Sequence, residues 1–395
     1  MDFTRTYSER LLGLAQHFPA LVLTGARQTG KTTLLRRAFP DHTYVSLDLP
    51  SAAELAELSP GEFLRAHPAP LLVDEVQYAP GLFRHLKLEI DAARHQMGRF
   101  ILTGSQKFVL MKSVADSLAG RAAIAELETL SLSELTQHHP WPGDVASLAH
   151  HMVRGGFPEL WREPRLPAAE FYRSYLATYL ERDVRQLLNV TSLRDFERFI
   201  RACASRSGSL LDKSSLARDV GVSPKAIGDW LSVLEASGQI KLLEPYFENV
   251  GKRLIKSPKL YLADTGLLCF LLGLDERSLP GSPYVGAIWE TFVYAELRKR
   301  MAVRSGTASL WFYRDSTQRE VDFLTVEGNR IELLEAKWTE NPEPRVASAL
   351  EAVATTLVQR GTRPEVTSAV VCRSPHRSMR GHQTAVFSLQ ELLAP

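Results

Sequence analysis

A glycine-rich stretch near the amino terminus has the spacing of a phosphate-binding loop. It follows the pattern G-x-x-x-x-G-K-[ST], comes after the apolar run LVLT and opens the helical run TTLLRRAF. Such a backbone wraps a phosphate with its N–H groups pointing inward, and the following helix adds a favourable dipole. The lysine neutralises the β and γ phosphates, and the hydroxyl after it ligates Mg²⁺. The residues expected to bind the nucleotide are Gly25, Ala26, Arg27, Gln28, Thr29, Gly30, Lys31, Thr32 and Thr33.

Two adjacent acidic residues supply the second half of such a site. The apolar run LLV ends in Asp74 and Glu75, about forty residues after the loop. Asp74 at the end of a buried strand can hold the Mg²⁺ shell together with Thr32, and Glu75 can polarise the attacking water. Because a candidate base is present, the pattern favours an ATPase over a module that only binds the nucleotide.

A further apolar run ends in polar residues, in the order Thr103-Gly104-Ser105-Gln106. A polar side chain here would lie between the carboxyl ends of the two other strands, near the γ phosphate. Ser105 is the first candidate to sense that phosphate and Thr103 the second. An ordinary turn at the end of a strand is the alternative.

Arg121, in the sequence SLAGR, precedes the last expected strand of this region. Its guanidinium could complete a neighbouring subunit's site as an arginine finger, or act as a sensor in its own site. A solvated arginine is the alternative. Arg27, inside the loop, is expected to shape the loop.

A second constellation lies near the carboxyl terminus. Asp322 is on one strand of an expected hairpin with a turn at 327–329, and Glu335 and Lys337 lie two apart on the other, so they share one sheet face. Asp322 and Glu335 could hold a second divalent metal, with Lys337 and the helix residue Glu290 nearby. The order helix, strand, strand, strand matches the PD-(D/E)XK nuclease core. The alternatives are an active nuclease and a binding domain that retains these residues for local ion pairing.

Residues 214–234 have the pattern of a helix-turn-helix, with a turn at Gly221 and a second helix that begins at Pro224. The following strand and return strand predict a winged helix. DNA could contact Lys225 on the second helix and a wing that carries Lys252, Arg253 and Lys256. Asp229 on the same helix would repel phosphates, and winged helices also dock proteins.

The elements that must position these residues predict an α/β chain. Short apolar runs at 20–25, 42–49, 69–75, 99–105 and 123–130 alternate with amphipathic stretches, which indicates a parallel sheet wrapped by helices. We expect a P-loop NTPase domain over 1–135, a helical linker region over 136–210, a winged helix over 211–284 and an α/β nuclease-like domain over 285–395.

Composition restricts the class of protein. The 395 residues carry 47 Lys and Arg against 45 Asp and Glu, so no global basic excess indicates nucleic acid binding. Residues 190–260 form the one basic segment.

Cys203, Cys269 and Cys372 lie far apart, which is typical of reduced thiols. The apolar run 265–274 is too short to cross a bilayer and predicts a buried helix. We therefore expect a cytoplasmic protein.

Taken in order, these motifs resemble the bacterial AAA-type ATPases with a carboxy-terminal domain of unknown function, relatives of the archaeal ATPase group. The resemblance covers nearly the whole chain. It includes the loop GARQTGKTT, LLVDEVQ, LTGSQ, SLAGR, RGGFPE at 154–159, YLERD at 179–183 and YLADTG at 261–266. It implies an ATP-binding core, a helical and winged-helix middle and a nuclease-like end. Arg182 and Asp183 match the family pattern without an evident chemistry.

These observations favour a Mg²⁺-dependent ATPase whose nucleotide state repositions the domains that follow. Its cofactors would be ATP and Mg²⁺, and its partners could be DNA, an unknown protein or further copies of the chain. One alternative is an ATP-gated protein that binds or cleaves DNA. Another is a nucleotide-dependent interaction switch with little turnover.

Overall fold

A computed structural model describes residues 3–105, 116–180, 193–246, 257–304, 306–315, 317–359 and 364–393, together with the single residues 110, 114 and 184. Arg182, Asp183, Lys252, Arg253 and Lys256, which the sequence singles out, lie outside the described residues. Unit 1 comprises residues 1–130, 157–163 and 236–238, and unit 2 comprises 131–156, 164–235 and 239–395.

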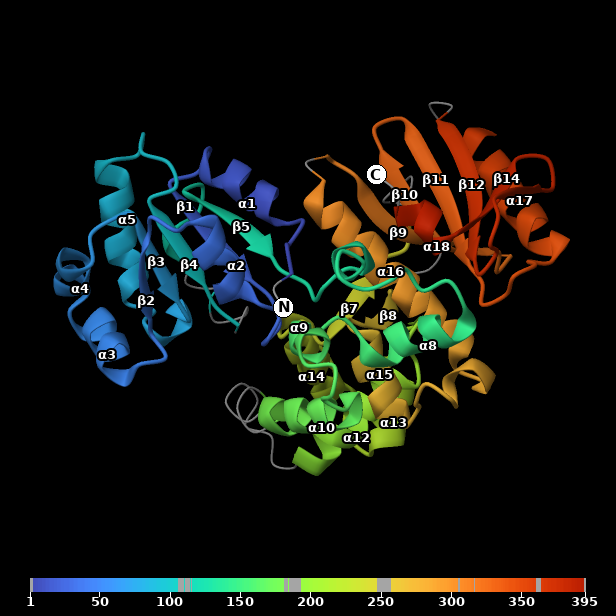
Figure 1. Cartoon of the computed structure of the whole chain (residues 1–395), viewed down its shortest axis with the longest axis horizontal. Coiled ribbons are helices and arrows are strands. Elements are labelled where there is room, and N and C mark those ends of the chain that lie inside the picture. Colours follow the sequence, from blue (N-terminus) through green and yellow to red (C-terminus); the bar gives the residue numbers. More distant parts are fainter. Residues whose placement is uncertain are drawn as a thin grey trace. The chain divides into compact units, whose positions relative to one another are not determined.

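Unit 1 is built on a parallel sheet of five strands in the order β2-β3-β4-β1-β5. Helices lie on both sides of this sheet (Figure 1). The strands are β1 (Ala20–Thr24), β2 (Thr43–Ser46), β3 (Leu71–Asp74), β4 (Phe100–Thr103) and β5 (Ala122–Glu126). The helices include α1 (Ser8–Ala15), α2 (Lys31–Ala38), α3 (Pro50–Leu58), α4 (Pro60–Ala66), α5 (Leu82–Ala92) and the short η1 (Val76–Tyr78). The expected α/β fold, with strands in all five apolar runs, is therefore confirmed.

The three central strands of this sheet are buried along their whole length. Each has neighbours on both sides and helices above and below, which favours continuous apolar sequence over alternation. The strands β2 and β5, in contrast, have exposed residues. These two are the outer strands of the sheet, where one side has no neighbouring strand.

The first part of unit 2 is mostly helical. Its helices are α7 (Leu132–Leu135), α8 (Val145–Arg154), α10 (Ala168–Tyr179), α12 (Leu193–Ala204), α13 (Lys213–Val220), α14 (Pro224–Ala236) and α15 (Thr265–Leu272), with a small antiparallel sheet of β6 (Ser209–Leu210), β8 (Lys259–Leu262) and β7 (Ile240–Leu243). Trp230 packs against Phe196 and Phe199 and adds an aromatic centre to the apolar face of α14. As expected, α15 is buried. Among the described helices, none combines the length and the apolar character needed to cross a bilayer.

The second part of unit 2 contains a mixed sheet of six strands in the order β13-β14-β12-β11-β10-β9. The expected hairpin joins β10 and β11 and turns between Glu327 and Arg330. The long helix α16 precedes the sheet, and α17 packs on β12. The elements are α16 (Val285–Val303), β9 (Ser309–Arg314), β10 (Glu320–Glu327), β11 (Arg330–Ala336), α17 (Pro344–Gln359), β12 (Glu365–Cys372), β13 (Ser378–Arg380), β14 (Thr384–Ser388) and α18 (Leu389–Leu393).

Two motifs that lie far apart in the sequence, RGGFPE and YLADTG, meet at one buried carboxylate in unit 2. Asp264 accepts backbone N–H bonds from Gly266 and Leu267 at the start of α15, and from Gly156 after α8. The hydroxyl of Tyr172 donates to Asp264 at 2.8 Å, and burial raises the pKa of that hydroxyl well above its usual range. Three helices are thus tied together through the four donors around a single side chain.

We predict that this carboxylate is a large contributor to the stability of unit 2. Asp264→Ala leaves buried N–H groups without an acceptor and should cost about 3 kcal/mol of unfolding free energy. Tyr172→Phe removes one donor and keeps the ring, so it should cost about 1 kcal/mol. Urea unfolding followed by circular dichroism measures both. Equal, small losses in the two variants would show that the carboxylate is not the common anchor.

Candidate functional site

The phosphate-binding pattern forms a loop between β1 and α2 in unit 1. Gly25 leaves the strand with a φ of 143°, and a Cβ there would lie 2.2 Å from the carbonyl oxygen of Leu127. A side chain at this position is therefore excluded by the backbone that follows β5. Lys31 is buried, and its ammonium donates to the carbonyl oxygens of Gly25 and Ala26 at 3.0 and 2.8 Å. The loop thus surrounds the lysine that the sequence assigns to the phosphates.

Thr32 and Asp74 lie side by side at the carboxyl edge of the sheet. The hydroxyl of Thr32 donates to Asp74 Oδ2 at 2.8 Å, and the hydroxyl of Tyr44 donates to the same oxygen at 3.0 Å. Burial raises the pKa of Asp74, while the two hydroxyl donors lower it. A hydroxyl and a carboxylate are oxygen ligands of the kind that Mg²⁺ prefers, so this pair fits the ion.

Glu75 and Ser105 are also brought together. The backbone at Glu75 is left-handed, with a φ of 55°, as the chain turns from β3 into η1. The hydroxyl of Ser105 donates to Glu75 Oε2 at 3.2 Å, and the amide of Gln77 donates to the same oxygen. Ser105 therefore contacts the candidate base.

Sequence reasoning assigned no role to Gln77, although it stands two residues after Glu75 in LLVDEVQ. Its side chain is buried, and its carbonyl packs so closely on Gly104 that a Cβ there would lie 2.2 Å from Gln77 Oε1. Glycine at position 104 thus leaves room for the amide. Thr103, the second candidate sensor, is fully buried on β4, and its hydroxyl has no hydrogen-bond partner among the described residues.

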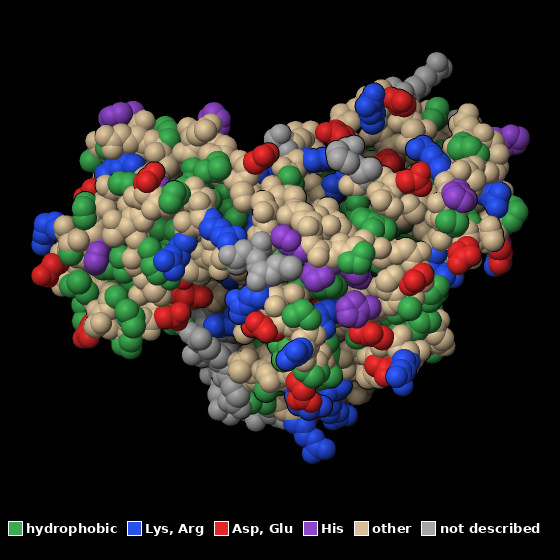
Figure 2. Space-filling view, viewed as in Figure 1, with side chains coloured by type: hydrophobic (Ala, Val, Ile, Leu, Met, Phe, Trp, Pro, Cys, Tyr) green, Lys and Arg blue, Asp and Glu red, His purple; other side chains and the backbone are tan. Residues whose placement is uncertain are grey.

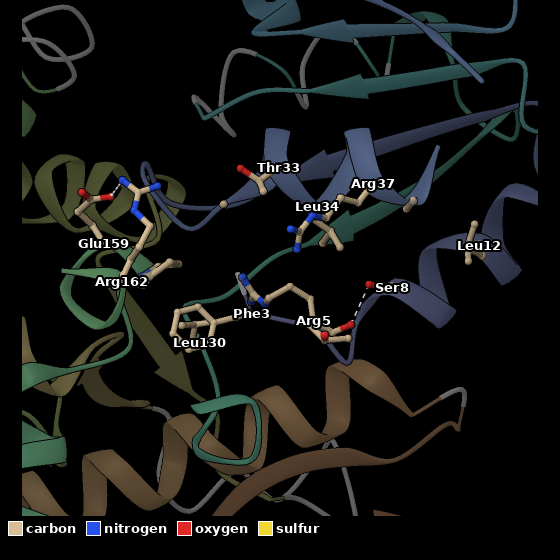
Figure 3. Close-up of a pocket in the computed structure, with 14 residues that line it drawn as sticks. Phe3, Arg5, Ser8, Leu12, Thr33, Leu34, Arg37, Leu130, Glu159 and Arg162 are labelled. Carbon is tan, nitrogen blue, oxygen red and sulfur yellow. Dashed lines mark hydrogen bonds and ion pairs between the residues drawn. The ribbon is translucent and has the colours of Figure 1, made fainter. Parts of the chain in front are cut away.

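A pocket of about 370 Å³ opens beside the loop in unit 1 (Figure 3). Gly30 and Thr33 line it from the loop and α2, and the amino-terminal segment and the short helix α9 (Pro158–Arg162) line it from the other sides. Arg5 holds that segment in place by donating to the carbonyls of Thr29 and Glu128 at 2.8 and 2.7 Å. Neither Arg5 nor α9 was assigned to the site from sequence, because Arg5 belongs to no motif and the motif RGGFPE, which leads into α9, suggests no chemistry by itself. Arg27 and Gln28 of the loop do not line this pocket.

Arg121 lies at the opposite edge of the sheet from Lys31. Its backbone carbonyl accepts from Ala20 at the start of β1, whereas the loop follows the end of that strand. Its guanidinium makes two bonds to Asp91 of α5, at 2.7 and 2.9 Å. Because the strands are parallel, this position separates Arg121 from the chain's own phosphate loop by the length of β1. A sensor role in its own site therefore does not fit; action across a subunit interface stays a prediction.

The structure brings together the carboxy-terminal residues named from sequence. Lys337 Nζ lies 2.7 Å from Glu335 Oε1 and 3.7 Å from Asp322 Oδ2, and Glu335 accepts the Asp322 N–H at 3.2 Å. We call the four carboxylates of this region the acidic cluster: Glu290, Glu320, Asp322 and Glu335. Sequence reasoning missed Glu320, which lies two residues before Asp322 and so on the same face of β10.

It also missed Lys259, whose Nζ lies within 3.3 Å of carboxylate oxygens of Glu290, Glu320 and Asp322. The signal that could have identified Lys259 is its place as a charged residue at the start of the buried strand KLYL. Among the residues that the structure describes, no group of three or more His, Cys, Asp or Glu is arranged to hold a metal ion. At the expected metal site, the ammonium of Lys337 contacts both Asp322 and Glu335, and the ammonium of Lys259 also contacts Asp322.

On α14, Lys225 and Asp229 are both exposed. Three arginines of the neighbouring basic segment are paired with acids, in the pairs Arg198–Asp195, Arg201–Glu197 and Arg206–Asp219. Figure 2 shows basic and acidic side chains interspersed over the visible face.

The raised pKa of Asp74 predicts an acid limit for Mg²⁺-dependent nucleotide binding, because a protonated carboxyl does not ligate the ion. Tyr44→Phe removes a donor that favours the ionised carboxylate, so the pKa of Asp74 should rise further. We expect Mg²⁺-dependent ATP affinity to fall at a higher pH in Tyr44→Phe than in the wild type, with little difference near pH 8. Titrations at a series of pH values measure this shift, and Tyr284→Phe on unit 2 is the control. Identical pH profiles for Tyr44→Phe and the wild type would contradict the assignment of Asp74.

Comparison with known proteins places three domain families along the chain. Residues 17–136 match an AAA domain, residues 145–278 match a domain of unknown function (DUF8612), and residues 285–392 match another (DUF4143). The AAA domain and the carboxy-terminal domain of unknown function agree with the resemblance seen in the sequence.

Relatives of the chain occur in bacteria and archaea. The chain is 23% identical over 347 residues to the uncharacterized protein MJ1544 of Methanocaldococcus jannaschii, covering 81% of this chain and 75% of that protein. Among solved structures, the Walker-type ATPase PABY2304 of Pyrococcus abyssi matches 69% of this chain and 96% of its own, with a TM-score of 0.45 and 17% identity. The uncharacterized protein Rv2008c of Mycobacterium tuberculosis is 32% identical over 346 residues, covering 86% of this chain and 74% of that protein. The chain thus belongs to the family of AAA-domain proteins that includes this mycobacterial relative.

Proposed function

We propose that the protein binds ATP with Mg²⁺ in the loop of unit 1 and hydrolyses it. The observation that carries this proposal is the contact of Thr32 with Asp74 at 2.8 Å, beside the buried Lys31. These groups come from the strand β3 and the start of the helix α2, and they meet where a triphosphate would sit on the amino terminus of that helix. When bound, Mg²⁺ supplies neutralisation of the phosphate charge.

The pocket beside the loop supports a nucleoside triphosphate as the ligand. Its volume of about 370 Å³ suits a base and a ribose, and it adjoins Gly30 and Thr33, where the phosphates would begin. Leu34, Leu130 and Pro158 give it apolar lining, and Arg37 and Arg162 add charge. We place the base and ribose of ATP there.

Glu75 is the candidate base in this mechanism. Gln77 and Ser105 donate to its carboxylate at the end of β3, and these two contacts support its position. In the hydrolytic step Glu75 takes a proton from the attacking water, while Lys31 stabilises the charge on the β and γ phosphates. Ser105 and Gln77 are then positioning residues that act through the carboxylate.

We further propose that the nucleotide state repositions unit 2. The chain crosses from unit 2 to unit 1 between Gly156 and Phe157, directly before α9, which lines the pocket. On the unit 2 side, Gly156 is tied to Asp264. A displacement of α9 on nucleotide binding would therefore act on a chain segment that is anchored at its other end. An arginine finger at Arg121 would additionally require an oligomer.

DNA binding remains the second candidate function. The order of α12, β6, α13, α14, β7 and β8, with a three-stranded antiparallel sheet, supports a winged helix. Exposed Lys225 is the described residue that would contact a phosphate backbone. We also propose that the first three domains end at residues 135, 210 and 284, as expected from the sequence.

Two variants test the ATPase directly. Lys31→Ala should weaken ATP binding about 100-fold or more, because the phosphates lose their buried cation. Glu75→Gln should bind ATP normally and lose at least about 100-fold in turnover. Phosphate release and nucleotide titration measure these effects, each with single- and double-stranded DNA added in turn. Wild-type turnover in Glu75→Gln would show that another group is the base, and stimulation by DNA would favour the second function.

A matched set of substitutions separates the two polar residues at the end of β4. Ser105→Ala and Gln77→Leu each remove a donor to Glu75, so kcat should fall about tenfold while KM stays close to the wild-type value. Thr103→Val keeps the shape of a side chain whose hydroxyl has no partner, and it should leave both constants unchanged. A loss of turnover confined to Thr103→Val would make Thr103 the functional residue.

A further inference from the structure

Lys259 lies at the centre of the acidic cluster of unit 2. Its side chain is 2% exposed, and its Nζ lies 2.7 Å from Glu320 Oε1, 3.0 Å from Glu290 Oε1 and 3.3 Å from Asp322 Oδ1. An ammonium group has three protons to donate, so one is available for each of these carboxylates. The three acceptors thus surround one buried cation.

Further cations and a hydroxyl group also contact the carboxylates of the acidic cluster. Lys337 pairs with Glu335, and Arg314 pairs with Glu320 at 2.9 Å. The hydroxyl of Tyr261 donates to Glu290 at 2.6 Å. Every carboxylate of the cluster therefore already has a cationic partner.

The charges of this region nearly cancel. Four carboxylates face three cations, Lys259, Lys337 and Arg314. This near balance leaves little net negative charge to attract a divalent ion.

The central cation comes from outside the carboxy-terminal family match. Lys259 and Tyr261 lie on β8, whereas the match begins at residue 285. Within residues 285–392, Lys337 contacts Asp322 and Glu335, whereas the ammonium that joins Glu290, Glu320 and Asp322 comes from Lys259, outside that match. The next residues of the same strand lead to Asp264, so β8 connects the acidic cluster to the anchor of the helical part.

We propose that Lys259 takes the place of a divalent cation in the acidic cluster, so that the cluster holds no metal and joins β8 to α16 and β10 as an ionic core. The ammonium distances are hydrogen-bond lengths, longer than the 2.0–2.1 Å of Mg²⁺–oxygen bonds. A metal would have to displace a cation that three carboxylates hold in a buried position. This proposal is independent of ATP hydrolysis in unit 1.

Binding of Mn²⁺ to the full chain tests this proposal, followed by the loss of the free-ion electron paramagnetic resonance signal. All proteins carry Asp74→Asn, so that the loop of unit 1 contributes no metal site, and no nucleotide is added. The chain with Lys259 should take up no Mn²⁺ at the cluster. Lys259→Met should gain a site at least about tenfold tighter than any in the control, and Asp322→Asn added to it should remove that site. Lys259→Arg keeps the charge and should gain none.

Two results would overturn the proposal. One is Mn²⁺ uptake by the chain with Lys259 that is lost in Asp322→Asn. The other is a folded Lys259→Met chain that gains no site. If Lys259→Met does not fold, the first comparison still decides, because it needs only the chain that retains Lys259. The thermal unfolding midpoint of folded Lys259→Met should rise with Mn²⁺, and that of the chain with Lys259 should not change.

Discussion

Parallel strands end at one edge of their sheet, and the candidate site of unit 1 depends on this constraint. The strands β3, β4 and β1 are neighbours, so Asp74, Ser105 and the phosphate loop are delivered to a common edge although they are far apart in the sequence. The same constraint places Arg121 at the other edge, because it precedes a strand that runs in the same direction. Whether a residue precedes or follows its strand therefore decides whether its side chain lies at the same edge as the phosphate loop.

At this edge of the sheet, neighbouring side chains hold the candidate base Glu75. Glu75 has a left-handed backbone and accepts from Gln77 and Ser105. Gly104 leaves room for the Gln77 amide, since any Cβ there would overlap it. These contacts restrict the conformational freedom of the Glu75 side chain.

Unit 2 shows how buried charges can tie elements together. Asp264 accepts hydrogen bonds from three parts of the chain, and Lys259 forms ion pairs with carboxylates of α16 and β10. An isolated buried charge is costly, so each of these side chains makes the elements around it interdependent. Both lie on or next to β8, and this strand therefore connects the helical part of unit 2 to its mixed sheet.

The sequence by itself determined the local features of this protein. Short-range spacing was enough for the phosphate loop, the five apolar strands and the hairpin with Glu335 and Lys337, because each depends on a few consecutive residues. The tertiary structure decided which side chains contact these local features. The contacts of Arg5 with Thr29 and of Lys259 with the carboxylates carry no motif, since each depends on a side chain reaching a partner that only folding brings near. Lys259 also changes the surroundings of Asp322, because the spacing of the carboxylates alone does not show that a buried ammonium lies among them.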